Sequence, residues 1–213
     1  MTIIAAADGS ALGNPGPAGW AWYVDESCWA AGGWPESTNN RGELTALLEL
    51  LRATAHTGED LLVQADSQYV INSVTKWMKG WKRRGWRKAD GKPVLNDDLM
   101  KAIDEALVGR TVRFEWVKGH AGHPANERAD VLARAAATAY QRGTAVPSGP
   151  GWTRGGAAAA APGATATSTS GASAATTLPR ASASSDTAAV VPGTTAARRA
   201  ALRAQQAEPG TLF

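Results

Sequence analysis

Three carboxylates of this 213-residue chain stand where predicted elements begin or end, and a fourth lies within the last predicted helix. Asp8 follows a short apolar run, and Asp66 follows a second one. Parallel strands that pair side by side bring their carboxyl ends to one edge of a sheet, where open α/β sheets bind ligands. Glu43, in the first turn of a predicted helix, and Asp130, in the last predicted helix, could converge on the same edge. Such an all-oxygen set favours Mg²⁺ or Mn²⁺ over Zn²⁺.

Each of these carboxylates also has a simpler explanation when it is taken alone. An acidic residue at a strand end or in the first turn of a helix often acts as a cap or interacts with the helix dipole. The sequence around each carboxylate, and the order of the elements that carry it, must therefore decide between the two interpretations.

Hydrophobic periodicity indicates which elements position these groups. Apolar and aromatic runs predict strands over residues 2–7, 18–24, 28–34, 61–65 and 111–117. Helical spacing predicts helices over residues 39–56, 67–78, 95–107 and 124–142. Glycines and cations over 79–93 predict an irregular, solvated projection. Three strands followed by alternating helices and strands predict an α/β fold with a five-stranded mixed sheet, an antiparallel meander joined by parallel strands, flanked by helices.

The C-terminal part of the chain has a different composition. Residues 147–213 are dominated by Ala, Gly, Ser, Thr and Pro, which bury too little apolar area to offset the entropy of ordering the backbone. We therefore expect a catalytic domain over 1–142 and a disordered, low-complexity tail over 143–213. Five arginines of this tail against two carboxylates account for the whole net charge of +3. The domain is neutral, although residues 76–92 hold eight Lys and Arg residues against one Asp.

Composition also bounds the compartment. The chain has a single cysteine, Cys28, which excludes an internal disulfide and a cysteine-based zinc site. A protein without disulfides is compatible with the reducing cytosol. No run approaches the ~20 apolar residues of a membrane span, and the first residues lack the basic region and length of a secretory signal. We expect a cytoplasmic monomer without membrane contact.

Four stretches carry the carboxylates in a context that a known family shares. They read DGSALGNPGP at 8–17, TNNRGEL at 38–44, DSQYV at 66–70 and WVKGHAGHPANERAD at 116–130. Together they closely resemble bacterial type 1 ribonuclease H over residues 2–142. The resemblance implies a ribonuclease H-like fold and an endonuclease that hydrolyses the RNA strand of RNA-DNA hybrids, leaving 5′-phosphate and 3′-hydroxyl ends.

The resemblance also implies the catalytic groups. Asp8, Glu43, Asp66 and Asp130 match the ligands of two divalent ions, Mg²⁺ with Mn²⁺ as an alternative. Two such ions roughly 3.5–4 Å apart suit in-line displacement at a phosphodiester. His120, on a loop flanked by glycines, matches a residue that assists proton transfer or product departure. Its simpler interpretation is a loop histidine without a role.

Substrate contacts follow from the same resemblance. Asn14, Asn39 and Gln68 match contacts to the RNA strand, whereas Thr38 and Asn96 match a phosphate pocket for the DNA strand. N-capping by Thr38 or Asn39 is compatible with both assignments. Residues 76–92 resemble a basic protrusion, and from it we predict substrate contacts by Trp81, Lys82, Arg83 and Arg84. Trp77, in helical phase with apolar residues, could instead belong to the core.

Departures from the family pattern and other functions stay open at this point. Gly42 replaces a larger residue before the glutamate, which costs ~0.5–1 kcal/mol in a helix relative to alanine and would loosen Glu43. One alternative is a catalytically silent hybrid-binding module that uses only residues 76–92. Another is a resolvase-like or integrase-like DNA nuclease of the same fold class. We expect truncation after Arg142 to leave hybrid cleavage near normal.

Overall fold

A computed structural model describes residues 1–154 of the chain. Residues 155–213, which make up most of the tail expected to be disordered, lie outside the described residues. Within residues 1–154, no helix is long and apolar enough to cross a membrane.

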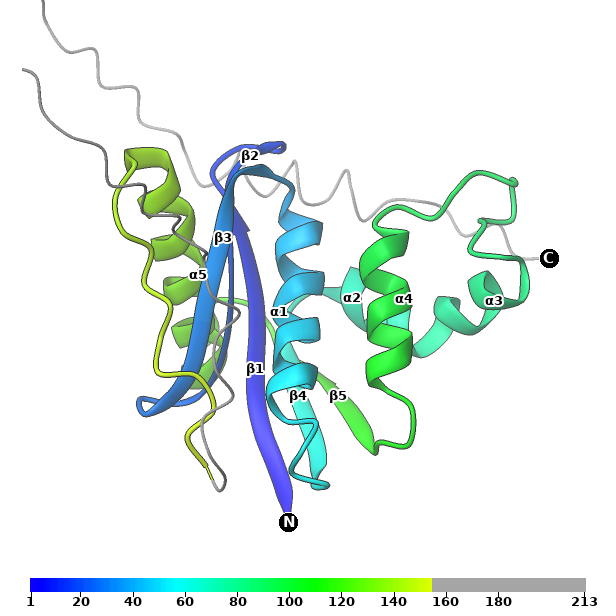
Figure 1. The fold of residues 1–213 in the computed structure, drawn as a ribbon, viewed down its shortest axis with the longest axis horizontal. Coiled ribbons are helices and arrows are strands. Elements are labelled where there is room, and N and C mark those ends of the chain that lie inside the picture. The colour runs from blue at the N-terminus through cyan, green and yellow to red at the C-terminus, as the bar shows by residue number, and fades with distance from the viewer. Residues whose placement is uncertain (155–213) are drawn as a thin grey trace, which may run out of the picture. The chain divides into compact units, whose positions relative to one another are not determined.

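The centre of the fold is a five-stranded sheet in the order β3-β2-β1-β4-β5 (Figure 1). The strands are β1 Thr2–Ala11, β2 Gly16–Asp25, β3 Cys28–Ser37, β4 Asp60–Ala65 and β5 Val112–Trp116. The first three form an antiparallel meander, whereas β4 is parallel to β1 and β5 is parallel to β4. This topology confirms the mixed sheet that the element order predicted.

Helices cover both faces of the sheet, with α1 and α5 on opposite sides (Figure 1). The helical segments are α1 Asn39–Ala53, α2 Gln68–Asn72, the π-helix η1 Ser73–Trp77, α3 Met78–Arg83, α4 Asp97–Ala106 and α5 Pro124–Arg142. Leucines of α1 pack on the face of β1 that carries Ile3, Ala5 and Ala7. The other face packs through small residues, where Ala21 and Ala31 meet Leu132 and Ala133 of α5.

Two helix boundaries differ from the sequence prediction for local reasons. Helix α1 ends at Ala53 rather than near 56, because the Thr54 hydroxyl donates to the Leu50 carbonyl and the Arg110 guanidinium donates to the Leu51 carbonyl. These bonds satisfy carbonyls at the helix end. The irregular segment predicted over 79–93 is wrong in its first part, since the helix begun at Gln68 continues through η1 and α3 to Arg83.

The folded part of the chain extends beyond Arg142, where we expected the domain to end. Residues 144–154, here called the C-terminal strap, turn back along the outer edge of β3. The backbone N–H of Ala31 donates to the Ser148 carbonyl at 3.1 Å, and the Gly151 N–H donates to the Trp29 carbonyl at 3.0 Å. The expected boundary is too early because composition averages hide these specific bonds to an edge strand.

Side chains fix the end of the C-terminal strap. Trp152 is only 6% exposed, and its ring centroid lies 6.5 Å from that of Trp22. Arg154 donates hydrogen bonds to the Asp25 carboxylate. These bonds, together with those from Ser27, lower the pKa of the Asp25 carboxyl to about 2. A single buried tryptophan thus supplies the apolar area that the surrounding glycines, alanines and prolines lack.

We predict that the C-terminal strap contributes to stability through Trp152. Trp152→Ala should lower the free energy of unfolding by about 3 kcal/mol, the cost of emptying a buried tryptophan site. Truncation after Arg142 should lower the melting temperature, whereas truncation after Arg154 should leave it close to that of the full chain. Thermal unfolding of the three variants checks this. Equal melting temperatures for the two truncations would contradict a packing role for the strap.

Candidate active site

Three carboxylates meet where β1 and β4 stop pairing. The β1-β4 ladder runs as far as the pair Ala6 and Gln64, so Asp8 and Asp66 lie just beyond it on neighbouring strands. Strand β1 itself continues past Asp8, because it still pairs with β2. Asp8, Glu43 and Asp66 each offer an oxygen atom within 4.8 Å of the other two.

Glu43 reaches this position because the first turn of α1 lies directly on β1. A Cβ atom at Gly42 would lie 2.7 Å from the Gly19 carbonyl oxygen, and one at Gly9 would lie 2.2 Å from the Glu43 nitrogen. The sequence predicted that Gly42 loosens Glu43, and the close approach gives the glycine a packing role as well. The Glu43 carboxylate is also held in place, because Asn39 Nδ2 donates to its Oε1 at 3.2 Å.

A cation would stabilise the clustered negative charges of this site. Burial raises the pKa of the Glu43 carboxyl well above its usual range, and the negative charges of Asp8, Asp66 and Asp130 raise it further. The hydrogen bond from Asn39 opposes this only in part. A divalent ion would relieve both the repulsion and the loss of hydration. Since all three donors are carboxylates, Mg²⁺ and Mn²⁺ fit the set better than Zn²⁺.

Asp130 approaches the same cluster from the other face of the sheet. It lies in α5 and contributes to the charge around Glu43, but it is not among the carboxylates that meet within 4.8 Å. Its Oδ2 atom lies 3.9 Å from Nδ1 of His120, whose side chain is 70% exposed. The fold therefore brings three of the four predicted carboxylates together and places the fourth beside them, next to His120.

The loop that carries His120 passes against Asp66. A Cβ atom at Gly119 would lie 2.3 Å from Oδ2 of Asp66, so any side chain at this position would force the carboxylate to move. His120 itself has a positive φ of 56°. Sequence reasoning singled out the histidine but missed the role of Gly119, because the contact joins residues more than 50 positions apart.

Of the predicted RNA-strand amides, Asn39 contacts the carboxylate cluster directly. Asn14 Oδ1 accepts from the backbone N–H of Asn39 at 3.3 Å, and Asn39 in turn donates to Glu43. Gln68 is exposed at the start of α2, which Ser67 caps by accepting from the Val70 N–H at 3.4 Å. Asn14 lies in the loop between β1 and β2, Asn39 begins α1, and Gln68 begins α2 two residues after Asp66.

The two residues predicted to bind the DNA strand are linked through Arg41. Thr38 Oγ1 accepts from the Arg41 N–H at 3.3 Å, which makes Thr38 the N-cap of α1. The Arg41 guanidinium donates to Asn96 Oδ1 at 3.4 Å and to both carboxylate oxygens of Asp98, at 3.2 and 2.6 Å. Sequence reasoning missed Arg41, because its partners lie on α4.

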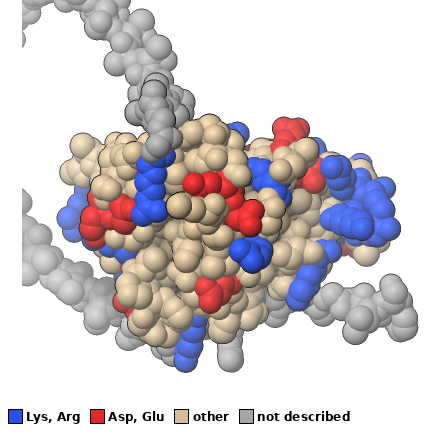
Figure 2. Space-filling model, turned by 90° about the horizontal axis from the view of Figure 1, so that it is seen from below, with Lys and Arg blue, Asp and Glu red and all other residues tan. Residues whose placement is uncertain are grey.

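The predicted substrate contacts of the basic segment have different surroundings. Lysines and arginines gather at the end of the molecule that carries α3 (Figures 1 and 2). Of the predicted contacts, Lys82 pairs with Asp104 at 2.6 Å, and Arg84 Nε donates to the Arg87 carbonyl. Arg83 is exposed.

Three aromatic side chains connect the carboxylate region to α3. The ring centroids of Tyr69 and Trp77 lie 6.3 Å apart, and those of Trp77 and Trp81 lie 5.7 Å apart. Trp77 is 40% exposed, so its possible assignment to the core is wrong, whereas Trp81 is partly buried against the core. The i, i+4 spacing of Trp77 and Trp81 in the sequence is the signal for this contact, because it is typical of side chains on one helix face.

The sequence comparison decides the family. A sequence model of RNase H matches residues 2–138. The chain belongs to the RNase H family. It is 58% identical to ribonuclease H of Tropheryma whipplei (strain Twist) over 151 residues, which cover 71% of this chain and 94% of that protein. Ribonuclease H of Pectobacterium atrosepticum is 50% identical over 135 residues, or 62% of this chain and 87% of that protein.

A solved structure agrees with this membership. The chain shares 30% sequence identity and a TM-score of 0.57 with LC9-RNase H1, described as a type 1 RNase H with the type 2 active-site motif. The match covers 73% of this chain and 79% of that one. The resemblance to type 1 ribonuclease H and the predicted fold class are thus confirmed, and this RNase H family member is an enzyme.

We predict that Glu43 destabilises the fold when no divalent ion is bound. Its folded-state pKa lies above the unfolded value of ~4.3, so stability falls as the pH rises from that value through the folded-state pKa. In chelator at pH 8, Glu43→Gln should therefore raise the melting temperature by at least about 2 °C, the shift that ~1 kcal/mol gives in a domain of this size.

The matched measurements are melting curves with chelator and with Mg²⁺, at pH 5 and at pH 8. Mg²⁺ should stabilise the wild type more than Glu43→Gln, and the difference between the two proteins in chelator should shrink at pH 5. Glu36→Gln, which changes an exposed carboxylate in β3, is the control. A Glu43→Gln variant that melts lower than the wild type in chelator would refute this reading of the cluster.

Proposed function

We propose that this enzyme hydrolyses the RNA strand of RNA-DNA hybrids in a reaction that depends on divalent metal ions and leaves 5′-phosphate and 3′-hydroxyl ends. The observation that carries the proposal is the convergence of Asp8, Glu43 and Asp66 within 4.8 Å, in a chain of the RNase H family. The repulsion among these groups and the raised pKa of Glu43 give the site a need for cations that a purely structural cluster would not have.

The carboxylates would hold the metal, with Asp130 completing the set from α5. The chemistry that two divalent ions would supply when bound there is activation of a water molecule on one side of the phosphodiester and stabilisation of the leaving oxygen on the other. Asp8 and Asp66 stand on neighbouring strands, and Glu43 is held by Asn39, so the chain fixes the direction of each carboxylate before substrate binds. Such preorganisation is the main contribution of a protein to this chemistry.

His120 is the group best placed to move a proton at the edge of the site. Its imidazole is exposed on a loop and lies 3.9 Å from Asp130, so it can reach solvent and substrate while staying near a metal-ligand candidate. We assign it to proton transfer to the departing 3′ oxygen or to release of the product.

Selection of a hybrid requires different contacts to the two strands. Asn14, Asn39 and Gln68 can donate to and accept from the 2′-hydroxyl groups of RNA. Thr38 and Asn96 lie on the N-terminal sides of α1 and α4, where backbone N–H groups favour a phosphate of the DNA strand. Arg41 hydrogen-bonds to both Thr38 and Asn96, so the two proposed DNA contacts keep a fixed separation from each other.

We predict that the wild type cleaves a labelled RNA-DNA hybrid in the presence of Mg²⁺ and leaves RNA duplex and DNA duplex intact. Asp66→Asn should lower the rate more than about 100-fold, because it removes a charged ligand from the centre of the cluster. Hybrid binding by Asp66→Asn, measured separately, should persist. Cleavage of all three duplexes would indicate a general nuclease. Binding without turnover in the wild type would indicate a silent binding module.

We predict that His120→Ala lowers kcat by about 100-fold, the usual effect of losing one proton-transfer group, and leaves KM nearly unchanged. The melting temperature should not change, because the side chain is exposed. His56→Ala is the matched control, since this exposed histidine follows the opposite end of α1 from Glu43. Steady-state kinetics on the hybrid measure both variants. An unchanged kcat for His120→Ala would remove the histidine from the mechanism.

A further inference from the structure

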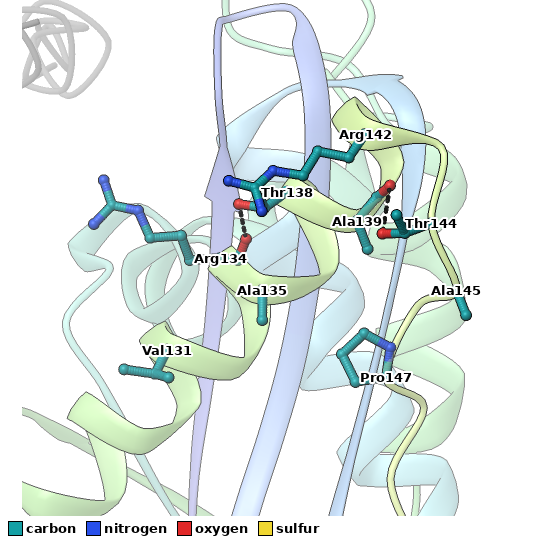
Figure 3. A pocket seen from close by; sticks show the side chains of 9 residues that line it. All are labelled: Val131, Arg134, Ala135, Thr138, Ala139, Arg142, Thr144, Ala145 and Pro147. Atoms are coloured by element: carbon teal, nitrogen blue, oxygen red, sulfur yellow. Dashed lines mark hydrogen bonds between the residues drawn. The ribbon is translucent and has the colours of Figure 1, made fainter.

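Two hollows on the surface of residues 1–154 differ in what they could bind. One, of about 480 Å³, lies between α5 and residues 144–147 (Figure 3). It combines small side chains with Arg134 and Arg142, a lining that indicates no particular ligand. The other, of about 360 Å³, lies beside the carboxylates and is lined by Gln68, Ile71, Asn72, Lys76 and Trp116. This second lining contains an aromatic ring, a cation and two amides.

Trp116 is the unusual residue of the second hollow. It ends β5, and its side chain is 51% exposed although it is a large apolar group. Its indole Nε1 donates to the backbone carbonyl of Asp66 at 3.1 Å. This bond fixes the edge of the ring beside the carboxylate cluster and leaves much of the indole open to solvent.

Polar side chains line the helical wall of the hollow. Gln68, Asn72 and Lys76 recur every four residues along α2 and η1. Eight residues of helix span about 12 Å, which corresponds to three or four nucleotides at ~3.4 Å each. No carboxylate among residues 1–154 forms an ion pair with Lys76, so its charge is available to a phosphate.

We propose that the second hollow binds the RNA strand beyond the scissile phosphodiester. The face of Trp116 packs against a ribose or base, Lys76 contacts a phosphate, and Asn72 reaches a 2′-hydroxyl. The hollow is continuous with Gln68, an RNA-strand contact that follows Asp66 by two residues. This inference rests on the proposed function, since it extends the same substrate along the same strand.

The RNA strand is favoured over the DNA strand by the position of the hollow. Residues 69 and 77, which start the aromatic series leading to α3, do not line it. Thr38 and Asn96, the proposed DNA contacts, belong to α1 and α4, and neither residue lines the hollow. The hollow therefore continues the RNA side of the site.

A simpler role for Trp116 is to position Asp66 through the hydrogen bond alone. Two substitutions separate these roles. Trp116→Phe removes the N–H donor and keeps an aromatic face, whereas Trp116→Ala removes both. If the hydrogen bond alone matters, both variants lose the same amount of kcat. If the ring binds RNA, only Trp116→Ala raises KM.

The test uses DNA-RNA-DNA chimeric strands paired with DNA, in which a short ribonucleotide block fixes the cleavage site. The block is then lengthened by one to four ribonucleotides on either side. On the side that reaches the hollow, Trp116→Ala should raise KM about 10-fold for extended blocks and leave it unchanged for the shortest block. Trp116→Phe should stay within about twofold of the wild type in KM.

Lys76 provides an independent measurement. Lys76→Gln should lower the slope of log KM against log salt concentration by about one unit for extended blocks, because one phosphate contact is lost. Lys101→Gln, which removes a cation paired with Asp97 on α4, is the control and should leave the slope unchanged.

Each outcome decides the inference separately from the proposed function. Equal KM values for Trp116→Phe and Trp116→Ala, or KM changes that do not depend on block length, would overturn the RNA-binding role of the hollow. The wild type would still cleave the hybrid in either case. A wild type that does not cleave the hybrid would instead overturn the proposed function.

Discussion

Repulsion among three clustered carboxylates is the constraint on which this fold depends. Asp8 and Glu43 are almost fully buried, and burial raises the pKa of Glu43, so the surrounding structure must hold charges that would otherwise separate. The sheet order places β1 beside β4, and the close contacts at Gly9 and Gly42 hold the start of α1 against β1 and β2. Packing of the leucines of α1 stabilises this arrangement and offsets its electrostatic cost.

Much of the fold could be predicted because its signals are local. Helix α5 spans residues 124–142 as the sequence predicted, since proline opens it and the glycine at 143 follows its last turn. The C-terminal strap could not be predicted in this way. The partners of Trp152 lie about 100 residues or more earlier in the chain, and a composition average over 67 residues hides one tryptophan.

In the candidate active site, too, local features could be predicted and contacts between distant residues could not. Short motifs identified the carboxylates and His120, because each motif combines a reactive residue with its local turn or cap. Gly119 and Arg41 were missed, because each acts on a residue more than 50 positions away: Gly119 on Asp66, and Arg41 on Asn96. The core stayed an open alternative for Trp77 at the sequence level, because helical phase alone does not tell a buried face from an exposed one at the end of a domain.

The C-terminal strap also covers part of one open edge of the sheet. An open edge strand presents unpaired N–H and C=O groups to which another strand can add. On β3 the chain's own backbone occupies such groups at Trp29 and Ala31. On the opposite edge, β5 is short and carries exposed Arg113 and Glu115. The two edges of the sheet are therefore protected against edge-to-edge association by different means, backbone pairing on β3 and a short, charged strand at β5.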